Sequence, residues 1–148
     1  LDMTDNIRPI EDSGPGYRLK VDSDGRLVFS LKNAEGSAST HVCEKTGALP
    51  LNQWRFVALR FNDEGKVSIT VLDTADQERG PSVVGEKSEV LQTSGKLVFT
   101  GPMLPRMGSN VDVSGNFLDG AIDEVGMVRG YVPDLALHDA FKNTGSPR

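Results

Sequence analysis

The strongest constraint on the fold is a pair of apolar segments, residues 54–61 and 66–72, separated by the turn sequence Asn-Asp-Glu-Gly at 62–65. Residues 66–72 alternate between apolar and polar side chains, which is the pattern of a β-strand with one buried face. Residues 54–61 are almost continuously apolar, which is typical of a strand that is covered on both faces. Together the two segments predict an antiparallel β-hairpin.

Other strand patterns lie on both sides of this hairpin. Residues 17–21 and 26–31 flank the turn 22–25, where Asp accepts local backbone hydrogen bonds and Gly supplies a positive φ. A weaker strand pattern occurs at 39–44 and a short one at 82–84, a further strand is predicted at 96–100, and the last long strand is predicted at 117–129. Residues 1–16 lack periodicity, so we expect an irregular segment there and one domain over 17–148. Many short strands with frequent turns and no internal repeat predict an all-β protein with two antiparallel sheets, a β-sandwich.

One helix is predicted near the end of the chain. Residues 135–142 place Leu137 and Phe141 one turn apart, so both side chains lie on the same apolar face. Pro133 and Asp134 are typical of a helix start, and Gly and Pro follow the segment at 145 and 147. The expected fold is therefore a sandwich with one short C-terminal helix.

Composition excludes some classes of partner. The 148 residues carry a net charge of -5 with both signs interspersed and no basic stripe, so a nucleic acid is not expected. No apolar run approaches the roughly 20 residues of a membrane span. The chain starts at Leu1 without a signal-peptide pattern, which favours a piece of a longer protein. Cys43 is the sole cysteine, and we interpret it as a small apolar strand residue.

Several of these patterns occur in an order that resembles a known family. Leu51-Asn52-Gln53-Trp54 precedes the strand RFVALRF, and the later segment 117–128 reads FLDGAIDEVGMV. In this order, with the hairpins and the terminal helix, they are similar to the laminin G-like, concanavalin A-like lectin superfamily. The resemblance implies a jelly-roll β-sandwich in which Trp54, Ile122 and Val125 belong to the core. The early strand ending in Trp that is usual in the family is not found, and Asp73-Thr74 departs from its usual turn.

A catalytic site is not expected. Glycosidases of this architecture use carboxylates that alternate along one strand, so that two of them face the same groove. Asp123 and Glu124 are adjacent and would face opposite sides of a strand. No nucleophile elbow or phosphate-binding loop occurs either.

The candidate binding residues are aromatic and polar side chains expected at the surface. Tyr17 and Tyr131 could stack on a sugar ring, because aromatic faces form such platforms. The predicted loop 103–116 offers hydrogen-bonding side chains, and loops on a rigid sandwich often carry binding sites. A plain solvated loop is the alternative for these loop residues, which are Arg106, Asn110, Asp112 and Asn116.

Asp123 is the candidate metal ligand. A carboxylate inside a buried strand needs an ion pair, hydrogen bonds or a metal ion. Structural pairing with an arginine is one interpretation, and Ca²⁺ with its oxygen ligands is the other. The resemblance also implies such an ion, a secreted or cell-surface location, and a glycan or extracellular protein as partner. The sequence thus predicts a non-catalytic recognition module, with a structural domain that packs against a catalytic domain of the same parent protein as the alternative.

Overall fold

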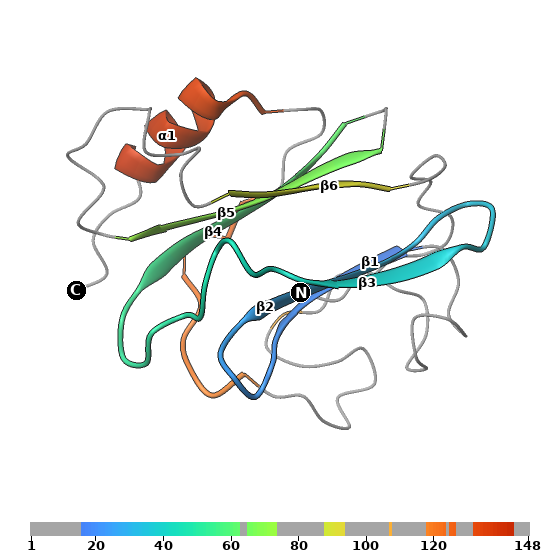
Figure 1. Cartoon of the computed structure of the whole chain (residues 1–148). Coiled ribbons are helices and arrows are strands. Elements are labelled where there is room, and N and C mark those ends of the chain that lie inside the picture. Colours follow the sequence, from blue (N-terminus) through green and yellow to red (C-terminus); the bar gives the residue numbers. More distant parts are fainter. Residues whose placement is uncertain are drawn as a thin grey trace.

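The computed structural model describes residues 16–62, 65–73, 88–93, 107, 118–123, 125–126 and 132–143. These residues form two antiparallel sheets and one C-terminal helix, as the sequence predicts, and each sheet has three strands (Figure 1). The first sheet has the order β1-β2-β3 and the second has the order β4-β5-β6. The elements in chain order are β1 (Gly16–Val21), β2 (Leu27–Lys32), β3 (Ala38–Val42), β4 (Arg55–Phe61), β5 (Lys66–Asp73), β6 (Ser88–Gln92) and α1 (Asp134–Asn143).

Tight turns set the register of the predicted hairpins. Between β1 and β2, Gly25 has a φ of 79° and donates its N–H to the carbonyl of Asp22 at 3.1 Å. Between β4 and β5, Gly65 has the same φ and donates to Asn62 at 3.2 Å. Because glycine adopts this left-handed conformation without a steric penalty, both reversals are tight. Each strand therefore starts within one or two residues of its predicted position.

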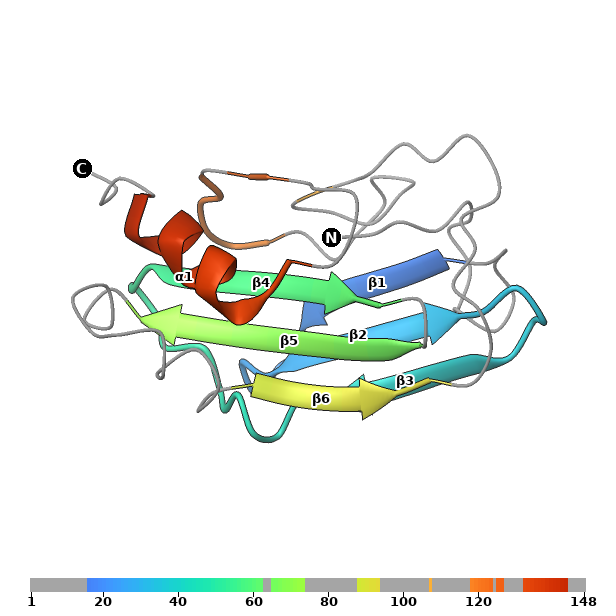
Figure 2. The ribbon, with the colours of Figure 1, turned by 90° about the horizontal axis from the view of Figure 1, so that it is seen from above.

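The two sheets share one hydrophobic core. In β2 the odd-numbered residues Leu27, Phe29 and Leu31 face this core, and in β5 Val67, Ile69 and Val71 do. All six side chains are at most 4 % exposed. Figure 1 shows the sheets facing each other in two layers, and Figure 2 shows β3 and β6 on the same side of the molecule. The period-two alternation seen in the sequence is thus satisfied by sheet-on-sheet packing.

Helix α1 covers the other face of the β4-β5-β6 sheet (Figures 1 and 2). Phe141 and Leu137 pack on Leu72, and Phe141 is only 2 % exposed. The ring of Phe56 lies 5.1 Å from the ring of Phe141, measured between centroids. The predicted apolar stripe of the helix is therefore confirmed, and its packing explains why β4 is apolar on both faces and why Leu72 of β5 is buried.

The last predicted strand is wrong for the residues that the structure describes. Residues 118–123 and 125–126 have no strand assignment, and Ile122 and Val125 are 50 % and 55 % exposed. Trp54 precedes β4 and is 39 % exposed, so its placement in the core is wrong too. Apolar composition alone does not bury a side chain when no strand partner or opposing layer covers it.

Strand β6 is a finding that the sequence did not predict. It pairs with β5 through the register Val67↔Leu91 and Ile69↔Glu89. The predicted strands at 82–84 and 96–100 lie outside the described residues, as does the irregular segment up to residue 15. Among the described residues, no helix is long and apolar enough to cross a membrane.

Candidate functional site

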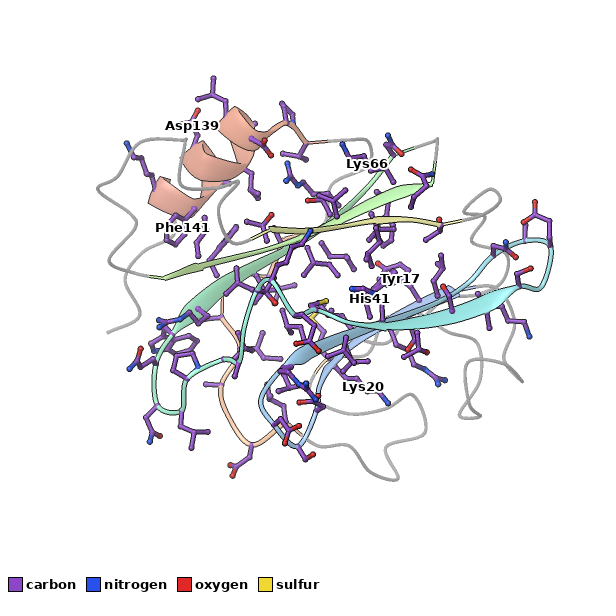
Figure 3. The ribbon with its side chains drawn as sticks, viewed as in Figure 1. Tyr17, Lys20, His41, Lys66, Asp139 and Phe141 are labelled. Atoms are coloured by element: carbon purple, nitrogen blue, oxygen red, sulfur yellow. The ribbon has the colours of Figure 1, made fainter. Side chains whose placement is uncertain are left out.

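Tyr17 lies in the core and not at the surface, so the prediction that it is exposed is wrong. It is 7 % exposed, and its ring centroid lies 4.9 Å from that of Phe61 and 6.5 Å from that of Phe29. Burial raises the pKa of the Tyr17 phenol, because the charged form loses its hydration. Figure 3 shows Tyr17 between the two sheets. Its ring is therefore not available to stack on a sugar.

The other predicted binding residues are not placed by the structure. They are Arg106, Asn110, Asp112, Asn116 and Tyr131, all of which lie outside the described residues. The binding loop at 103–116 therefore stays a prediction.

Asp123 is exposed and is not part of a strand. The predicted burial of this carboxylate is wrong, and an exposed carboxylate needs no metal ion because water solvates it. Within the described part of the chain, no three His, Cys, Asp or Glu side chains are grouped so that they could hold a metal ion. The Ca²⁺ site at Asp123 stays a prediction without structural support.

Asp22 and Asp24 are turn residues, as the pattern at 22–25 predicts. Arg26 forms ion pairs of 3.1 Å with Asp22, 2.9 Å with Asp24 and 3.4 Å with Glu44. The Asp22 carboxylate also accepts the backbone N–H groups of Arg26 and Asp24, at 2.8 and 2.9 Å. These contacts, the Arg26 N–H first, hold the pKa of Asp22 below its usual range. Through the Arg26–Glu44 ion pair, the cluster links the first hairpin to the segment that follows β3.

Arg60 forms a second polar cluster, beneath helix α1. It is 7 % exposed and donates to the hydroxyls of Ser68 and Thr70, at 3.2 and 3.5 Å. It also donates to the carbonyl of Val132, at 3.0 Å, and pairs with Asp134. All these partners belong to β5 or to the start of the helix, so we interpret the cluster as a structural clamp.

The described residues form a small groove between the edges of the two sheets. Its volume is about 190 Å³, and it lies where β3 and β6 run along the same side of the molecule (Figure 2). Strand alternation directs Ser39 and His41 of β3 toward the opposite sheet, because they pair with the core residues Leu31 and Phe29. Figure 3 shows His41 between the layers. The lining residues are Phe29, Ser39, Thr40, His41, Leu91, Gln92 and Thr93.

The groove combines apolar side chains with uncharged hydrogen-bonding groups. Phe29, which is 2 % exposed, and Leu91 are its apolar lining residues, and the other lining residues supply hydroxyl, amide and imidazole groups. None of the lining residues is Asp, Glu, Lys or Arg, so the pair of carboxylates that a glycosidase uses is not among them. Such a surface can hold a neutral polar group through hydrogen bonds. Sequence reasoning missed it, because β6 was not predicted and its partner across the groove is distant in the chain.

Comparison with known proteins finds no match for this chain. The chain matches no protein-family model, no curated protein and no solved structure. The function is therefore argued from the groove and the surfaces described above.

Proposed function

We propose that the chain is a non-catalytic recognition module that binds a neutral polar group of a glycan or a protein in the groove between β3 and β6. The observation that carries the proposal is the set of uncharged hydrogen-bonding side chains that line the groove together with the apolar residues Phe29 and Leu91. Binding sites commonly combine an apolar surface with a few placed polar groups. The volume of about 190 Å³ is below the usual range for drug-sized ligands, so the groove suits one sugar ring or one side chain.

We propose further that the two sheets belong to a jelly-roll sandwich of the laminin G-like type. The two hairpins, their face-to-face packing and the terminal helix support this assignment. The segment 117–128 does not support it, because its described residues are exposed. Under this proposal the domain is secreted or on the cell surface, and it accompanies a catalytic domain in its parent protein. A bound Ca²⁺ would raise the melting temperature, and a chelator would lower it again.

Binding to the groove is tested with a glycan array and with two variants of its lining residues. His41→Ala and Gln92→Ala each remove a hydrogen-bonding group, and we expect retained glycans to bind about tenfold more weakly to each. Lys20→Ala is the control, because Lys20 is exposed on the face of β1 that points away from the core. Isothermal titration with one retained glycan measures the change. Equal affinities for all four proteins would place the binding site elsewhere.

Exposed apolar side chains favour a second function, a domain that packs against another domain and has no ligand. Leu51 is 88 % exposed and Trp54 39 %, both just before β4. Ile122 and Val125 are about half exposed, and their segment lies beside β4 in Figures 1 and 2. Apolar surface of this kind often marks an interface. Trp54→Ser should then bind less of an apolar dye than the parent protein and show less self-association in light scattering. The parent protein should give no signal on the glycan array.

A further inference from the structure

The outer edge of β3 carries backbone groups that no described strand pairs with. In an antiparallel ladder, alternate residues direct their N–H and C=O toward the partner strand and the others direct them away. Cys43 donates its N–H to Leu27 at 2.8 Å, and Asn33 donates to Ser37 at 3.0 Å. Given the register of β2 and β3, residues 39 and 41 also face β2. The backbone groups of Ala38, Thr40 and Val42 therefore point outward.

This edge lacks the devices that usually prevent strand addition. Natural sheets protect their edges with lysine, proline, bulges or very short strands. Residues 38–42 read Ala-Ser-Thr-His-Val, with no proline and no Asp, Glu, Lys or Arg. Ala38 and Thr40 are exposed, and the pairing with β2 is continuous over the five residues. An extended segment can therefore approach the outward backbone groups closely.

The groove lies beside this same edge. A strand added to β3 would direct every second side chain toward the face that carries Ser39 and His41. One of these side chains would enter the groove, where Leu91 and Gln92 of β6 form the opposite wall. The lining holds no Asp, Glu, Lys or Arg to pair with a buried charge, so an uncharged side chain is favoured there.

We propose that β3 binds an extended, uncharged peptide segment of a partner protein, which adds to the sheet as a further strand and inserts one side chain into the groove. Backbone hydrogen bonds supply affinity in this mode, and the side-chain pocket supplies specificity. The inference rests on the proposed recognition function and names the class of its ligand.

The test selects peptides from a phage-displayed library of random linear sequences and measures a synthetic selected peptide by fluorescence anisotropy. Thr40→Pro removes an outward N–H but leaves the ladder to β2 intact, and proline is tolerated at such edge positions. We expect Kd to rise about tenfold or more. Thr40→Ala is the matched control, because it loses the same hydroxyl contact with Ser30 but keeps the N–H. Because Thr40 also lines the groove, the Kd of Thr40→Ala gives the effect of losing the side chain, and the further rise in the Kd of Thr40→Pro gives the effect of losing the N–H.

Amide hydrogen exchange provides a second measurement that needs no proline variant. On addition of the peptide, the outward amides of Thr40 and Val42 should become protected, while those of Ser39 and His41 are already protected by β2. Ala38→Pro serves as an independent edge variant if Thr40→Pro does not fold.

The possible results separate the two proposals. Selected peptides that bind Thr40→Pro with the same affinity as the parent protein would overturn strand addition. A dimer of the parent protein that is lost in Thr40→Pro would also overturn it, because a second copy of the chain would then occupy the edge of β3. Glycans that depend on His41 and Gln92, with no selected peptide, would overturn the peptide inference and leave the recognition function standing. The absence of both kinds of ligand would remove both proposals.

Discussion

Arg60 is the residue whose chemistry most clearly depends on the fold. Its guanidinium lies beneath helix α1, yet Asp134, its acidic partner, has a side chain that is 60 % exposed. The hydroxyls of Ser68 and Thr70 are buried, and both accept hydrogen bonds from Arg60. Loss of the arginine would therefore remove the hydrogen bonds that these buried hydroxyls accept from it, whereas loss of the aspartate would leave them in place.

We expect Arg60→Met to lower the free energy of unfolding by about 2–3 kcal/mol, because it removes the buried hydrogen bonds that the guanidinium donates to Ser68, Thr70 and the carbonyl of Val132. Asp134→Asn should cost less, about 1 kcal/mol, since the asparagine oxygen can still accept the Arg60 N–H and the side chain at 134 is 60 % exposed. Urea denaturation followed by circular dichroism measures both values. An equal loss in the two variants would show that the exposed pair, and not the buried hydroxyl contacts, carries the interaction.

Asp22 makes a pH-dependent contribution at the first hairpin. Its pKa is lower in the folded protein than in the unfolded chain, so the carboxylate stabilises the fold fully above the ordinary aspartate pKa of about 4. This contribution is lost as the pH falls through the folded pKa. We expect Asp22→Asn to be less stable than the parent at pH 7, and the difference to shrink toward pH 2.5. A difference in denaturation midpoint that does not change with pH would contradict this assignment.

At the scale of elements, helix α1 depends on a single aromatic anchor. Phe141 packs on Leu72 and Phe56, whereas Leu135 in the first turn is 60 % exposed. Phe141→Ala should lower the free energy of unfolding by about 3–5 kcal/mol, because it removes a buried ring and leaves a cavity. Leu135→Ala is the control and should change it by less than about 0.5 kcal/mol. Comparable values in urea denaturation would mean that the helix is not docked through this face.

The elements also show how far local patterns predict structure. The hairpins β1–β2 and β4–β5 and helix α1 are confirmed, because a turn with a left-handed glycine or an apolar stripe is visible within a few residues. Strand β6 is short and follows a polar stretch, so nothing local distinguishes it from a loop. Its pairing with β5 decides its conformation, and that partner begins more than fifteen residues earlier in the chain.

At the scale of the whole molecule, Cys43 reports the integrity of the shared core. Its side chain is 0 % exposed, so a thiol reagent reaches it only when the sheets separate. We expect labelling in native buffer to be slower than in denaturant by roughly a thousandfold or more. Phe29→Ala, in the core, should accelerate labelling, and the surface variant Lys20→Ala should not. Rapid labelling of the parent protein would show that the sheets do not enclose this residue.

The candidate site also belongs to the scale of the whole molecule. The sequence predicts that the candidate binding residues are exposed, but the exposure of a side chain depends on what packs above its strand. Tyr17 lies on the same face of β1 as Leu19 and becomes part of the core, while Trp54 lies just outside its strand and meets solvent. The groove needs β3 and β6 side by side, although they lie in different sheets and about fifty residues apart in the chain.

Alternating apolar residues and glycine turns were enough to determine that this chain forms antiparallel hairpins with one amphipathic helix, because those signals act between residues that are close in the chain. The tertiary structure alone decided which aromatic rings are buried, where Arg60 finds its partners and which strand edges meet at the groove. These features arise when segments far apart in sequence come into contact, and burial is a property of that contact.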